Sequence, residues 1–351
     1  MKSVPLEFSP DYYDYALPEE LIAYYPPQNR EESKLLVIER STKSLYFHEN
    51  FSEIKRYLRA GDVLVLNKTK VFPARLSAKK PTGGKVEVLL LKKTTGTVFQ
   101  TEVLLKGKSI KPGVEFVSEG EMIRFKVLEK LEDGKYYVEM ESLTGSSLDE
   151  LIKIEGKAPL PPYIKREPSE LDLIRYQTVF AEEEGSVAAP TAGFHFTKEL
   201  LNRLSQMGVR IKFITLHVGY GTFKPIKTKD VRKHSLDPEY VKVSPDVVEE
   251  VKLALSQGRR IIACGTTTVR ALEFIASRGL SSYEGLCDLF IYPGYEFKVV
   301  SAIITNFHLP KSSLLLLVCT FAGRDLIFKA YEEAIKRKYR FYSYGDATFI
   351  I

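Results

Sequence analysis

A run of short strands in the first half of the sequence constrains the fold more than any other feature. From about Lys68 to Ser142 the chain holds only segments that alternate apolar and polar residues, namely KVEVLLLKK, TVFQTEVLLKG, EMIRFKVLEKL and KYYVEMES. Turn sequences separate them at Thr95-Gly96, Lys111-Pro112-Gly113 and Asp133-Gly134. Regular hairpins without a helical period predict a small antiparallel β-barrel, which we place at residues 67–150.

The flanking segments mix helix and strand patterns instead. Upstream, KLLVIERSTKSLYFHEN has the pattern of a hairpin that turns at Ser41 to Ser44. Downstream, two amphipathic helices begin after the capping residues Thr197 and Ser244, and an apolar strand follows each helix. This alternation predicts an α/β fold with helices packed on a mixed, largely parallel sheet. We expect residues 1–66 and 151–351 to form one discontinuous α/β domain that carries the active site, with the barrel inserted into it.

Length and composition agree with two folded domains. A chain of 351 residues exceeds what one hydrophobic core usually supports, and 44% hydrophobic with 27% charged residues is typical of a soluble globular protein. The net charge of +6 permits a nucleic acid partner without requiring one. Three scattered cysteines, Cys264, Cys287 and Cys319, are too few for a disulfide framework or an iron–sulfur cluster. Without a signal peptide, a membrane-length apolar run or coiled-coil heptads, we expect a cytoplasmic monomer with no membrane contact.

Three of the five histidines stand at the end of an apolar segment, beside glycine or proline. They are His195 in AAPTAGFHF, His217 in TLHVG and His308 in NFHLP. In an extended FHF the two phenylalanines point one way and His195 points the other, toward a cavity. Ligands of α/β sheets bind beyond the carboxyl ends of the strands, so we expect these imidazoles at one site. Two alternatives are separate structural histidines and a zinc site, although no His-x-His or His-Glu-x-x-His spacing supports zinc.

Two glycine-containing strand ends differ in what they predict. FITLHVGYGTF contains Gly219 and Gly221, but FKPIK follows, so no helix N-terminus is available for a phosphate there. In IIACGTTTVRALEF, Gly265 and Thr266 to Thr268 open a helix. Its unpaired N–H groups and the hydroxyls suit a carboxylate or phosphate, and the alternative is simple N-capping by threonine.

The segment KRKYRFYSYGDA near the C-terminus interleaves cationic and aromatic side chains. Cations for phosphates and rings for unpaired bases are how proteins hold single-stranded RNA loops. The alternative is a helix end with basic residues against its dipole, followed by an aromatic strand. In the barrel, FPARLSAKKPTGGKVEVLLL places Arg75, Lys85 and Glu87 at or near a double-glycine turn, as a charged wall or as a solvated strand edge. The RNA-binding candidates are Arg75, Lys85, Lys336, Arg337, Lys338 and Arg340.

Several long motifs together resemble one known family, the S-adenosylmethionine:tRNA ribosyltransferase-isomerases of queuosine biosynthesis. The motifs are LPEELIAYYP, GDVLVLNKTKVFPARL, TGGKVEVLLL, YQTVFAEEEGSVAAPTAGFHFT, TLHVGYGTFKP, GTTTVRALE, DLFIYPGY, ITNFHLPKSSLLLLV and YRFYSYGDA, in the family's order from about Leu17 to Asp346. The resemblance implies an α/β domain that carries an inserted β-barrel. The sequence departs from the family pattern in HSLDPE, which keeps His234 and Glu239 but has Leu236 and Asp237 in place of Met-His. It also departs at Cys287, where threonine is usual.

The resemblance implies an unusual use of S-adenosylmethionine. Its ribosyl part is transferred to 7-aminomethyl-7-deazaguanine at the tRNA wobble position and isomerised, which gives epoxyqueuosine in tRNA and releases adenine and methionine. No metal is expected. The reaction needs a base for a 5′-proton and an acid or donor for adenine, and imidazole suits both roles. We predict His195 or His217 as the base with Asp237 or Glu239 in reserve, and His308 with Asn306 at adenine or ribose.

Further residues are predicted to bind S-adenosylmethionine. Thr266 to Thr268 with Arg270 would hold the methionine carboxylate, and Phe194 or Tyr220 would present a ring to the sulfonium. The substrate-binding set is Thr191, Phe194, Gly219, Tyr220, Gly221, Thr266, Thr267, Thr268, Arg270 and Asn306. Two other hypotheses are an S-adenosylmethionine-dependent RNA methyltransferase and a non-enzymatic RNA-binding module.

Overall fold

A nine-stranded mixed sheet forms the centre of the larger unit of the computed structural model, which describes residues 4–131, 133–223 and 225–351. The strand order is β15-β13-β12-β3-β14-β16-β17-β1-β2. The strands are β1 Leu35–Glu39, β2 Ser44–His48, β3 Val63–Asn67, β12 Arg210–Leu216, β13 Glu239–Val243, β14 Ile261–Cys264, β15 Tyr283–Cys287, β16 Ala302–Asn306 and β17 Ala347–Ile350. The pairs β12/β3, β3/β14, β14/β16 and β17/β1 are parallel, and the other four are antiparallel. The sheet is therefore mixed as predicted, but it is only half parallel.

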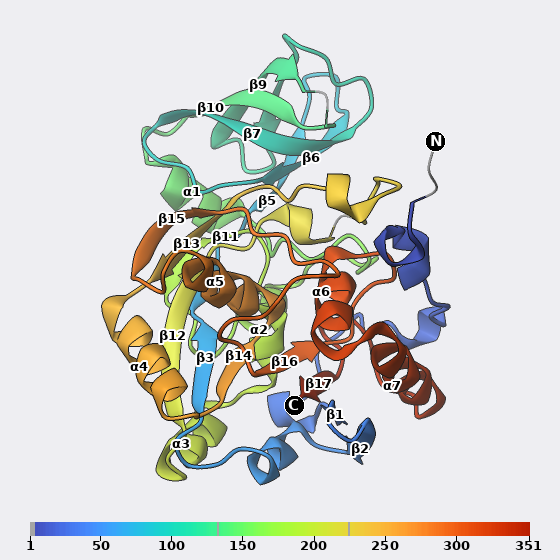
Figure 1. The fold of residues 1–351 in the computed structure, drawn as a ribbon. Coiled ribbons are helices and arrows are strands. Elements are labelled where there is room, and N and C mark those ends of the chain that lie inside the picture. Colours follow the sequence, from blue (N-terminus) through green and yellow to red (C-terminus); the bar gives the residue numbers. More distant parts are fainter. Residues whose placement is uncertain (1–3, 132, 224) are drawn as a thin grey trace.

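Helices cover both faces of this sheet (Figure 1). The helices are α3 Lys198–Gln206, α4 Pro245–Ser256, α5 Thr266–Ser277, α6 Ser313–Ala322 and α7 Arg324–Lys336. Alternate residues of β3 enter two different cores: Val63 and Val65 pack in the cluster that contains α4 to α7, and Leu64 and Leu66 in the cluster that contains α3. All four are fully buried, as expected for a central strand with both faces covered.

The inserted unit is a closed antiparallel barrel with the strand order β10-β7-β6-β5-β8-β9. Its strands are β5 Arg75–Lys79, β6 Lys85–Leu90, β7 Val98–Gly107, β8 Glu115–Ser118, β9 Ile123–Lys130 and β10 Tyr136–Ser142. Side chains alternate as the sequence predicts: Val86 and Val88 point into the barrel core and Lys85 is exposed. Helix α1, Leu148–Glu155, adds Leu148, Leu151 and Ile152 to that core.

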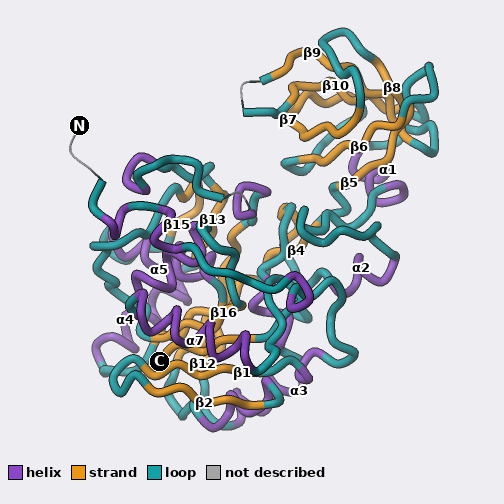
Figure 2. Tube along the Cα trace, turned by 90° about the vertical axis from the view of Figure 1, so that its right-hand side faces the viewer, coloured by secondary structure: helices purple, strands orange, loops and turns teal. Residues whose placement is uncertain are grey.

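A short two-stranded sheet joins the two units. It pairs β4, Thr69–Val71, in parallel with β11, Glu183–Ser186, and helix α2, Glu170–Arg175, lies in the returning chain. Figure 2 shows β4 between the barrel and the larger sheet. The mixed α/β fold with its inserted barrel is thus confirmed. The boundaries at 67–150 stay a proposal, since β3 ends at Asn67 and α1 continues past residue 150.

Short 3-10 helices occupy several connections. They are η1 Leu6–Phe8, η2 Pro10–Tyr13, η3 Glu19–Leu21, η4 Arg30–Glu32, η5 Phe51–Arg56, η6 Thr191–His195, η7 Tyr220–Phe223 and η8 Val231–Lys233. The η6 segment corrects one prediction, because Phe194 and His195 belong to a 3-10 helix and the FHF segment is not extended. All three residues of FHF are buried, with exposed fractions of 6%, 3% and 0%.

Candidate active site

A cleft of about 730 Å³ lies between the barrel and the carboxyl ends of the sheet strands. The barrel contributes Leu91, Lys92, Glu102, Leu104, Asp133 and Lys135 to its lining. The α/β part contributes the segment from His217 to Thr222 after β12, the segment from His234 to Tyr240 at β13, and Thr267 and Arg270 of α5. The volume is within the range of small-molecule sites, which is about 300–1,000 Å³.

A smaller pocket of about 60 Å³ adjoins this cleft, because Val218, Thr222, Thr267 and Leu314 line both. Five of the motifs that lie far apart in the sequence meet around it. They contribute Pro190 and Thr191, Val218 and Thr222, Gly265 to Thr267, Thr305 to Leu309, and Tyr342 and Ser343. Three sheet strands, β12, β14 and β16, end at these segments, so the site lies where the carboxyl ends of neighbouring strands converge.

The first turn of α5 supplies free polar groups to the cleft. Its N-cap is Gly265, whose φ is +89°, and no side chain caps the helix, so threonine N-capping is not what this motif does. Thr268 donates its hydroxyl to the Cys264 carbonyl at 2.7 Å. In contrast, Thr267 Oγ1 is buried without a hydrogen-bond partner among the described residues. An uncapped helix N-terminus with a free hydroxyl suits an anionic group.

Arg270 lies one turn further along α5 and has a second unsatisfied group. The guanidinium forms an ion pair with Glu239 and donates from Nε to the Leu289 carbonyl at 2.8 Å. Both residues of the ion pair are buried, with exposed fractions of 5% for Arg270 and 7% for Glu239. Nη2 of Arg270 has no partner within the described part of the chain. Glu239 also accepts from the Gly219 N–H at 2.7 Å, and therefore holds the loop after β12 against α5.

His217 is half-buried at the wall of the cleft, with one ring nitrogen held and the ring packed closely against a glycine. Nδ1 is 2.8 Å from Thr69 Oγ1, and the ring stacks on Tyr240 with centroids 5.0 Å apart. Beside Nε2 lies Gly185, where an added Cβ would be only 2.4 Å away. Burial lowers the pKa of His217, and the nearby Glu183 opposes that shift. The imidazole is therefore neutral near pH 7.

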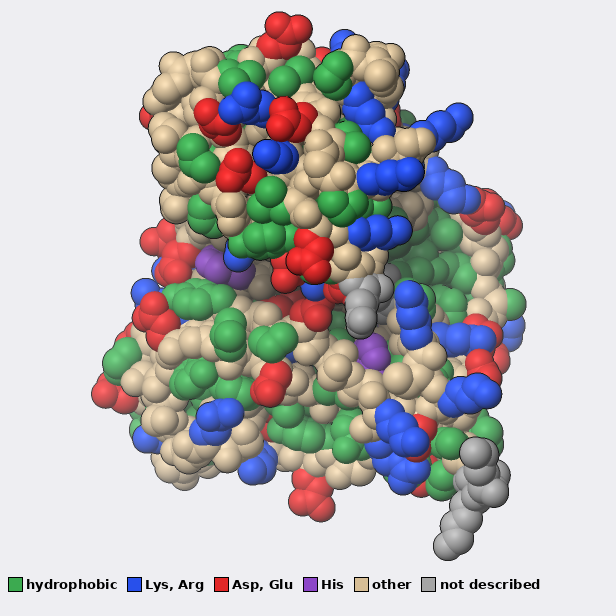
Figure 3. All heavy atoms as spheres, turned by 90° about the horizontal axis from the view of Figure 1, so that it is seen from above, with side chains coloured by type: hydrophobic (Ala, Val, Ile, Leu, Met, Phe, Trp, Pro, Cys, Tyr) green, Lys and Arg blue, Asp and Glu red, His purple; other side chains and the backbone are tan. Residues whose placement is uncertain are grey.

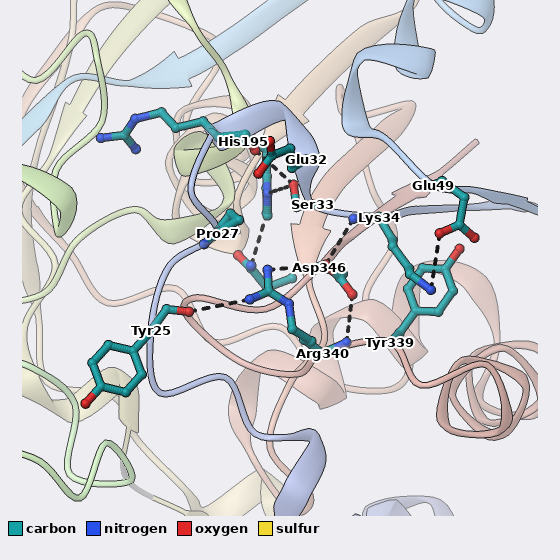
Figure 4. Close-up of polar contacts among 12 residues, drawn as sticks. Tyr25, Pro27, Glu32, Ser33, Lys34, Glu49, His195, Tyr339, Arg340 and Asp346 are labelled. Carbon is teal, nitrogen blue, oxygen red and sulfur yellow. Dashed lines mark hydrogen bonds and ion pairs between the residues drawn. The ribbon is translucent and has the colours of Figure 1, made fainter.

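His195 does not line the cleft or the small pocket; it lies behind them. Its Nδ1 is 2.6 Å from Ser33 Oγ, and Nε2 is 3.2 Å from Asn306 Nδ2 (Figure 4). Because the amide nitrogen of Asn306 donates, Nε2 accepts and the proton of the neutral ring is on Nδ1. Burial, reinforced by Arg340 and Arg30, lowers the pKa of His195 to about 3. Both ring nitrogens are thus engaged with the protein.

His308 and Asn306 do line the small pocket. His308 Nε2 is 3.0 Å from Thr305 Oγ1, and burial lowers its pKa to about 3. Asn306 accepts from the Thr191 hydroxyl at 3.0 Å, so the Asn306 amide lies between Thr191 and His195. The structure therefore brings His308, Asn306 and Thr191 together at one pocket and places His217 in the adjoining cleft.

The remaining substrate candidates are divided between the cleft and the core. Gly219, Tyr220, Gly221 and Asp237 line the cleft, and Asp237 Oδ2 would be 3.3 Å from a Cβ added at Gly221. Thr266 lines the small pocket, and Thr268 is fully buried. Phe194 lines neither cavity. Its ring instead packs against Tyr176 and Tyr344 and carries the Arg30 guanidinium at 5.7 Å.

The C-terminal basic and aromatic segment is not an open RNA-binding surface. Its rings are buried, with exposed fractions of 1% for Tyr339, 0% for Phe341, 7% for Tyr342 and 2% for Tyr344, which favours the structural alternative over stacking on bases. These rings pack in the domain core, where burying their large apolar area stabilises the fold.

The basic residues proposed for RNA binding are in varied environments. Lys336 and Arg337 form ion pairs with Glu333, and Arg340 pairs with Asp346 (Figure 4). Lys338 is exposed, as is Lys85 on the barrel. Arg75 is tied to Glu87 and to the Leu160 carbonyl at 3.0 and 2.9 Å. Figure 3 shows Lys and Arg side chains beside a hollow that contains hydrophobic side chains, on the face seen from the barrel end.

Three residues at the site escaped the sequence analysis. Ser33 fixes the tautomer of His195, Thr69 holds His217, and Gly185 leaves room for the His217 ring. Thr69 lies in the motif GDVLVLNKTKVFPARL, directly after an apolar strand. Polar residues at the end of a buried strand are typical of a site, so this position could have been found from the sequence. Ser33 and Gly185 lie in segments with no local pattern that distinguishes them.

No group of three or more His, Cys, Asp or Glu side chains suited to a metal ion occurs within residues 4–131, 133–223 and 225–351. His195, His217 and His308 each contact a different hydroxyl and do not converge as zinc ligands. Within the same residues, none of the helices has the length and apolar character needed to cross a membrane.

Comparison with known proteins shows which family this arrangement represents. The sequence matches the family described as queuosine biosynthesis protein over residues 10–350. The chain belongs to this family. A relative from Aquifex aeolicus, named S-adenosylmethionine:tRNA ribosyltransferase-isomerase, is 49% identical over 341 residues, which are 97% of this chain and 98% of the relative. One of the same name from Thermotoga petrophila is 47% identical over 340 residues, again 97% and 98% of the two chains.

A solved structure supports the same assignment. The S-adenosylmethionine tRNA ribosyltransferase of Thermotoga maritima is similar with a TM-score of 0.54 at 36% identity, over 97% of this chain and 99% of that one. The family resemblance seen in the sequence motifs is thus confirmed, together with the fold that it implied.

Proposed function

We propose that this protein is an S-adenosylmethionine:tRNA ribosyltransferase-isomerase. It transfers and isomerises the ribosyl part of S-adenosylmethionine onto 7-aminomethyl-7-deazaguanine at the wobble position of tRNA. The products are epoxyqueuosine-tRNA, adenine and methionine. One observation carries the proposal beyond the family match: motifs from five separate parts of the sequence line one small pocket that opens into the interdomain cleft.

The first turn of α5 suits the methionine carboxylate. Thr267 Oγ1 and Arg270 Nη2 are both buried and both without partners in the described chain, and both residues line the cleft. Leaving a buried donor unsatisfied costs about 1–3 kcal/mol, more for a charged group, so a bound carboxylate would recover that energy. Arg270 cannot turn away, because Glu239 and the Leu289 carbonyl fix its other nitrogens.

His217 suits the role of general base better than His195 does. The Thr69 hydroxyl lies 3.5 Å from the Glu183 carbonyl as a donor, so Thr69 Oγ1 accepts from Nδ1–H of His217. Nε2 then carries a lone pair at the wall of the cleft, and the lowered pKa keeps the ring neutral. The lone pair of His195 Nε2 is not available for proton removal, because it accepts a hydrogen bond from Asn306. We therefore assign proton removal to His217 and the positioning of Asn306 to His195.

His308 and Asn306 are proposed to contact the adenine or ribose from the small pocket. Thr191 and His195 fix the Asn306 amide from both sides, so its orientation is set before any ligand binds. Preorganised donors of this kind lower a barrier because they need no reorientation during the reaction. Asp237 and Gly219 to Gly221 line the adjoining cleft together with residues of the barrel.

Product analysis with tRNA that carries the aminomethyl base tests the proposal. The expected products from S-adenosylmethionine are free adenine and methionine in equal amounts. S-adenosylhomocysteine would instead indicate a methyltransferase, and intact S-adenosylmethionine with bound tRNA would indicate a binding module. Either of these results would overturn the proposal.

The cytoplasmic location and the monomeric state are also part of the proposal. Light scattering coupled to gel filtration tests the second, and a mass near 80 kDa in place of the 39.9 kDa of one chain would contradict it, because two chains double the mass.

A further inference from the structure

A third pocket, behind His195, carries positive charge that none of the carboxylates in the described ranges balances. Arg30 and Arg175 line it together with Pro27, Phe194, His195 and Tyr344. Arg30 donates to the carbonyls of Gln177 and Phe194 at 2.8 and 3.2 Å, and Arg175 donates to those of Pro27 and Gln28 at 2.6 and 3.1 Å. Among the described residues, the neighbouring Asp172 pairs with Arg166 and not with either of these arginines.

The two guanidinium groups are close enough to repel each other. Burial, followed by the charge of Arg175, lowers the pKa of Arg30 to about 10. Nε of Arg175 is buried and has no hydrogen-bond partner within the described residues. Two half-buried cations bound only to carbonyls line a pocket of about 10 Å³, and Arg175 Nη1 is at its exposed side, so an anion would contact the pair from outside the pocket.

An exposed aromatic ring lies on the same N-terminal segment as this pocket. Tyr25 is 64% exposed, and the Arg166 guanidinium lies 4.3 Å from its ring centroid. Arg166 is itself fixed by two hydrogen bonds of 2.7 Å to Asp172, so it supports the ring from one side. In Figure 4 the Tyr25 ring points away from Arg340 and Asp346. A fixed, exposed ring next to cations is how proteins stack unpaired bases of RNA.

The pocket lies next to the candidate active site. The 3-10 helix η6, Thr191–His195, connects the two: its first residues, Thr191 and Ala192, line the small pocket of the active site. Its last residues, Phe194 and His195, line the arginine pocket, and Ser343 lines both. A five-residue 3-10 helix is about 10 Å long, so the two pockets are neighbours.

We propose that Arg30 and Arg175 bind a backbone phosphate of the tRNA anticodon loop, and that Tyr25 stacks on a base of the same loop. The inference rests on the proposed function, in that tRNA is the substrate whose wobble base enters the cleft. The arginine pocket would then bind the part of the anticodon loop that flanks the wobble base. Lys336 and Arg337 are less suited to this contact, because both form ion pairs with Glu333. Phe194 holds Arg30 in place through its ring face.

The test is the affinity for tRNA at several salt concentrations. Arg175→Gln removes one phosphate contact, so the slope of log K against log salt falls in magnitude by about 0.7–0.9. Arg203→Gln, an exposed arginine on α3 that lines none of the three pockets, is the matched control and leaves the slope unchanged. Tyr25→Ala weakens binding by about tenfold, whereas Tyr25→Phe keeps the ring and the affinity. The KM for S-adenosylmethionine stays at the wild-type value in all four variants.

The outcomes separate this inference from the proposed function. If wild-type protein releases adenine but Arg175→Gln keeps the wild-type salt slope, the arginine pocket does not bind tRNA. Equal affinities of Tyr25→Ala and Tyr25→Phe would remove the stacking role. If inorganic phosphate binds the wild type but not Arg175→Gln while tRNA affinity is equal, the pocket serves a free anion and the inference is overturned. Arg175→Lys guards against misfolding, because it keeps the charge and is expected to keep the slope.

Discussion

Replacing Gly185 by alanine tests whether the position of His217 matters for catalysis. A Cβ at residue 185 would lie 2.4 Å from Nε2 of His217, whereas ordinary contact begins at 3.4 Å, so the two groups must separate by 3.4 − 2.4 = 1.0 Å. The imidazole cannot simply rotate away, because it stacks on Tyr240 and is hydrogen-bonded to Thr69. A misplacement of about 1 Å at a reacting group costs on the order of 100-fold in rate.

We therefore expect Gly185→Ala to lower kcat by about 100-fold while the KM for S-adenosylmethionine changes little. The crowding itself destabilises the fold by about 1–3 kcal/mol, which urea unfolding measures separately. Gly84→Ala is the matched control, since a Cβ there meets its nearest neighbour at 3.6 Å, and its activity should stay at the wild-type value.

A double-mutant comparison makes the test stricter. In a His217→Ala background the clash disappears, so adding Gly185→Ala should lower kcat no further. A folded Gly185→Ala protein with kcat within twofold of the wild type would refute the assignment of His217 as the base. So would an equal loss of activity in both backgrounds.

Three further predictions follow from the site. His195 and His308 have a pKa of about 3 when folded and 6.5 when unfolded, so below pH 6.5 protons bind the unfolded chain preferentially. Below pH 6.5, each histidine therefore lowers the free energy of unfolding by about 1.4 kcal/mol for every unit by which the pH decreases. Urea titrations at pH 7 and pH 5 measure this loss, and an equal stability at both pH values would be inconsistent with two buried neutral rings. Thr267→Val removes a buried hydroxyl that has no hydrogen-bond partner among the described residues, so it should keep or raise the unfolding midpoint and raise the KM for S-adenosylmethionine by about 10-fold or more; an unchanged KM would exclude Thr267 from binding. Exhaustive dialysis against EDTA should leave turnover at the wild-type rate, and a loss restored by zinc would revive the metal hypothesis.

The local patterns of the sequence were sufficient for much of the fold. Alternation in KVEVLLL placed Val86 and Val88 inside a barrel, and Thr197 and Gly265 marked the starts of α3 and α5. The order of the strands in the sheet was out of reach. Strand β17 at the C-terminus lies between β16 and β1, and such pairing depends on contacts between distant parts of the chain that no local pattern encodes.

At the site, the sequence indicated which residues lie near the cavities better than it indicated how those residues are oriented and buried. Thr267 and Arg270 of α5 line the cleft, because a helix that follows a buried strand has few alternative positions. The expected orientation of FHF was wrong because the backbone after Pro190 forms a 3-10 helix as far as His195, and all three side chains are buried. Two alternatives stayed open for the C-terminal rings, because composition does not distinguish a buried aromatic segment from an exposed one.

A crystal structure of the complex with S-adenosylmethionine would show whether these residues form the active site. We expect the methionine carboxylate within hydrogen-bonding distance of Thr267 Oγ1 and Arg270 Nη2, with the ribose C5′ facing Nε2 of His217. A ligand bound away from the ends of β12, β14 and β16, with His217 Nε2 remote from C5′, would contradict it.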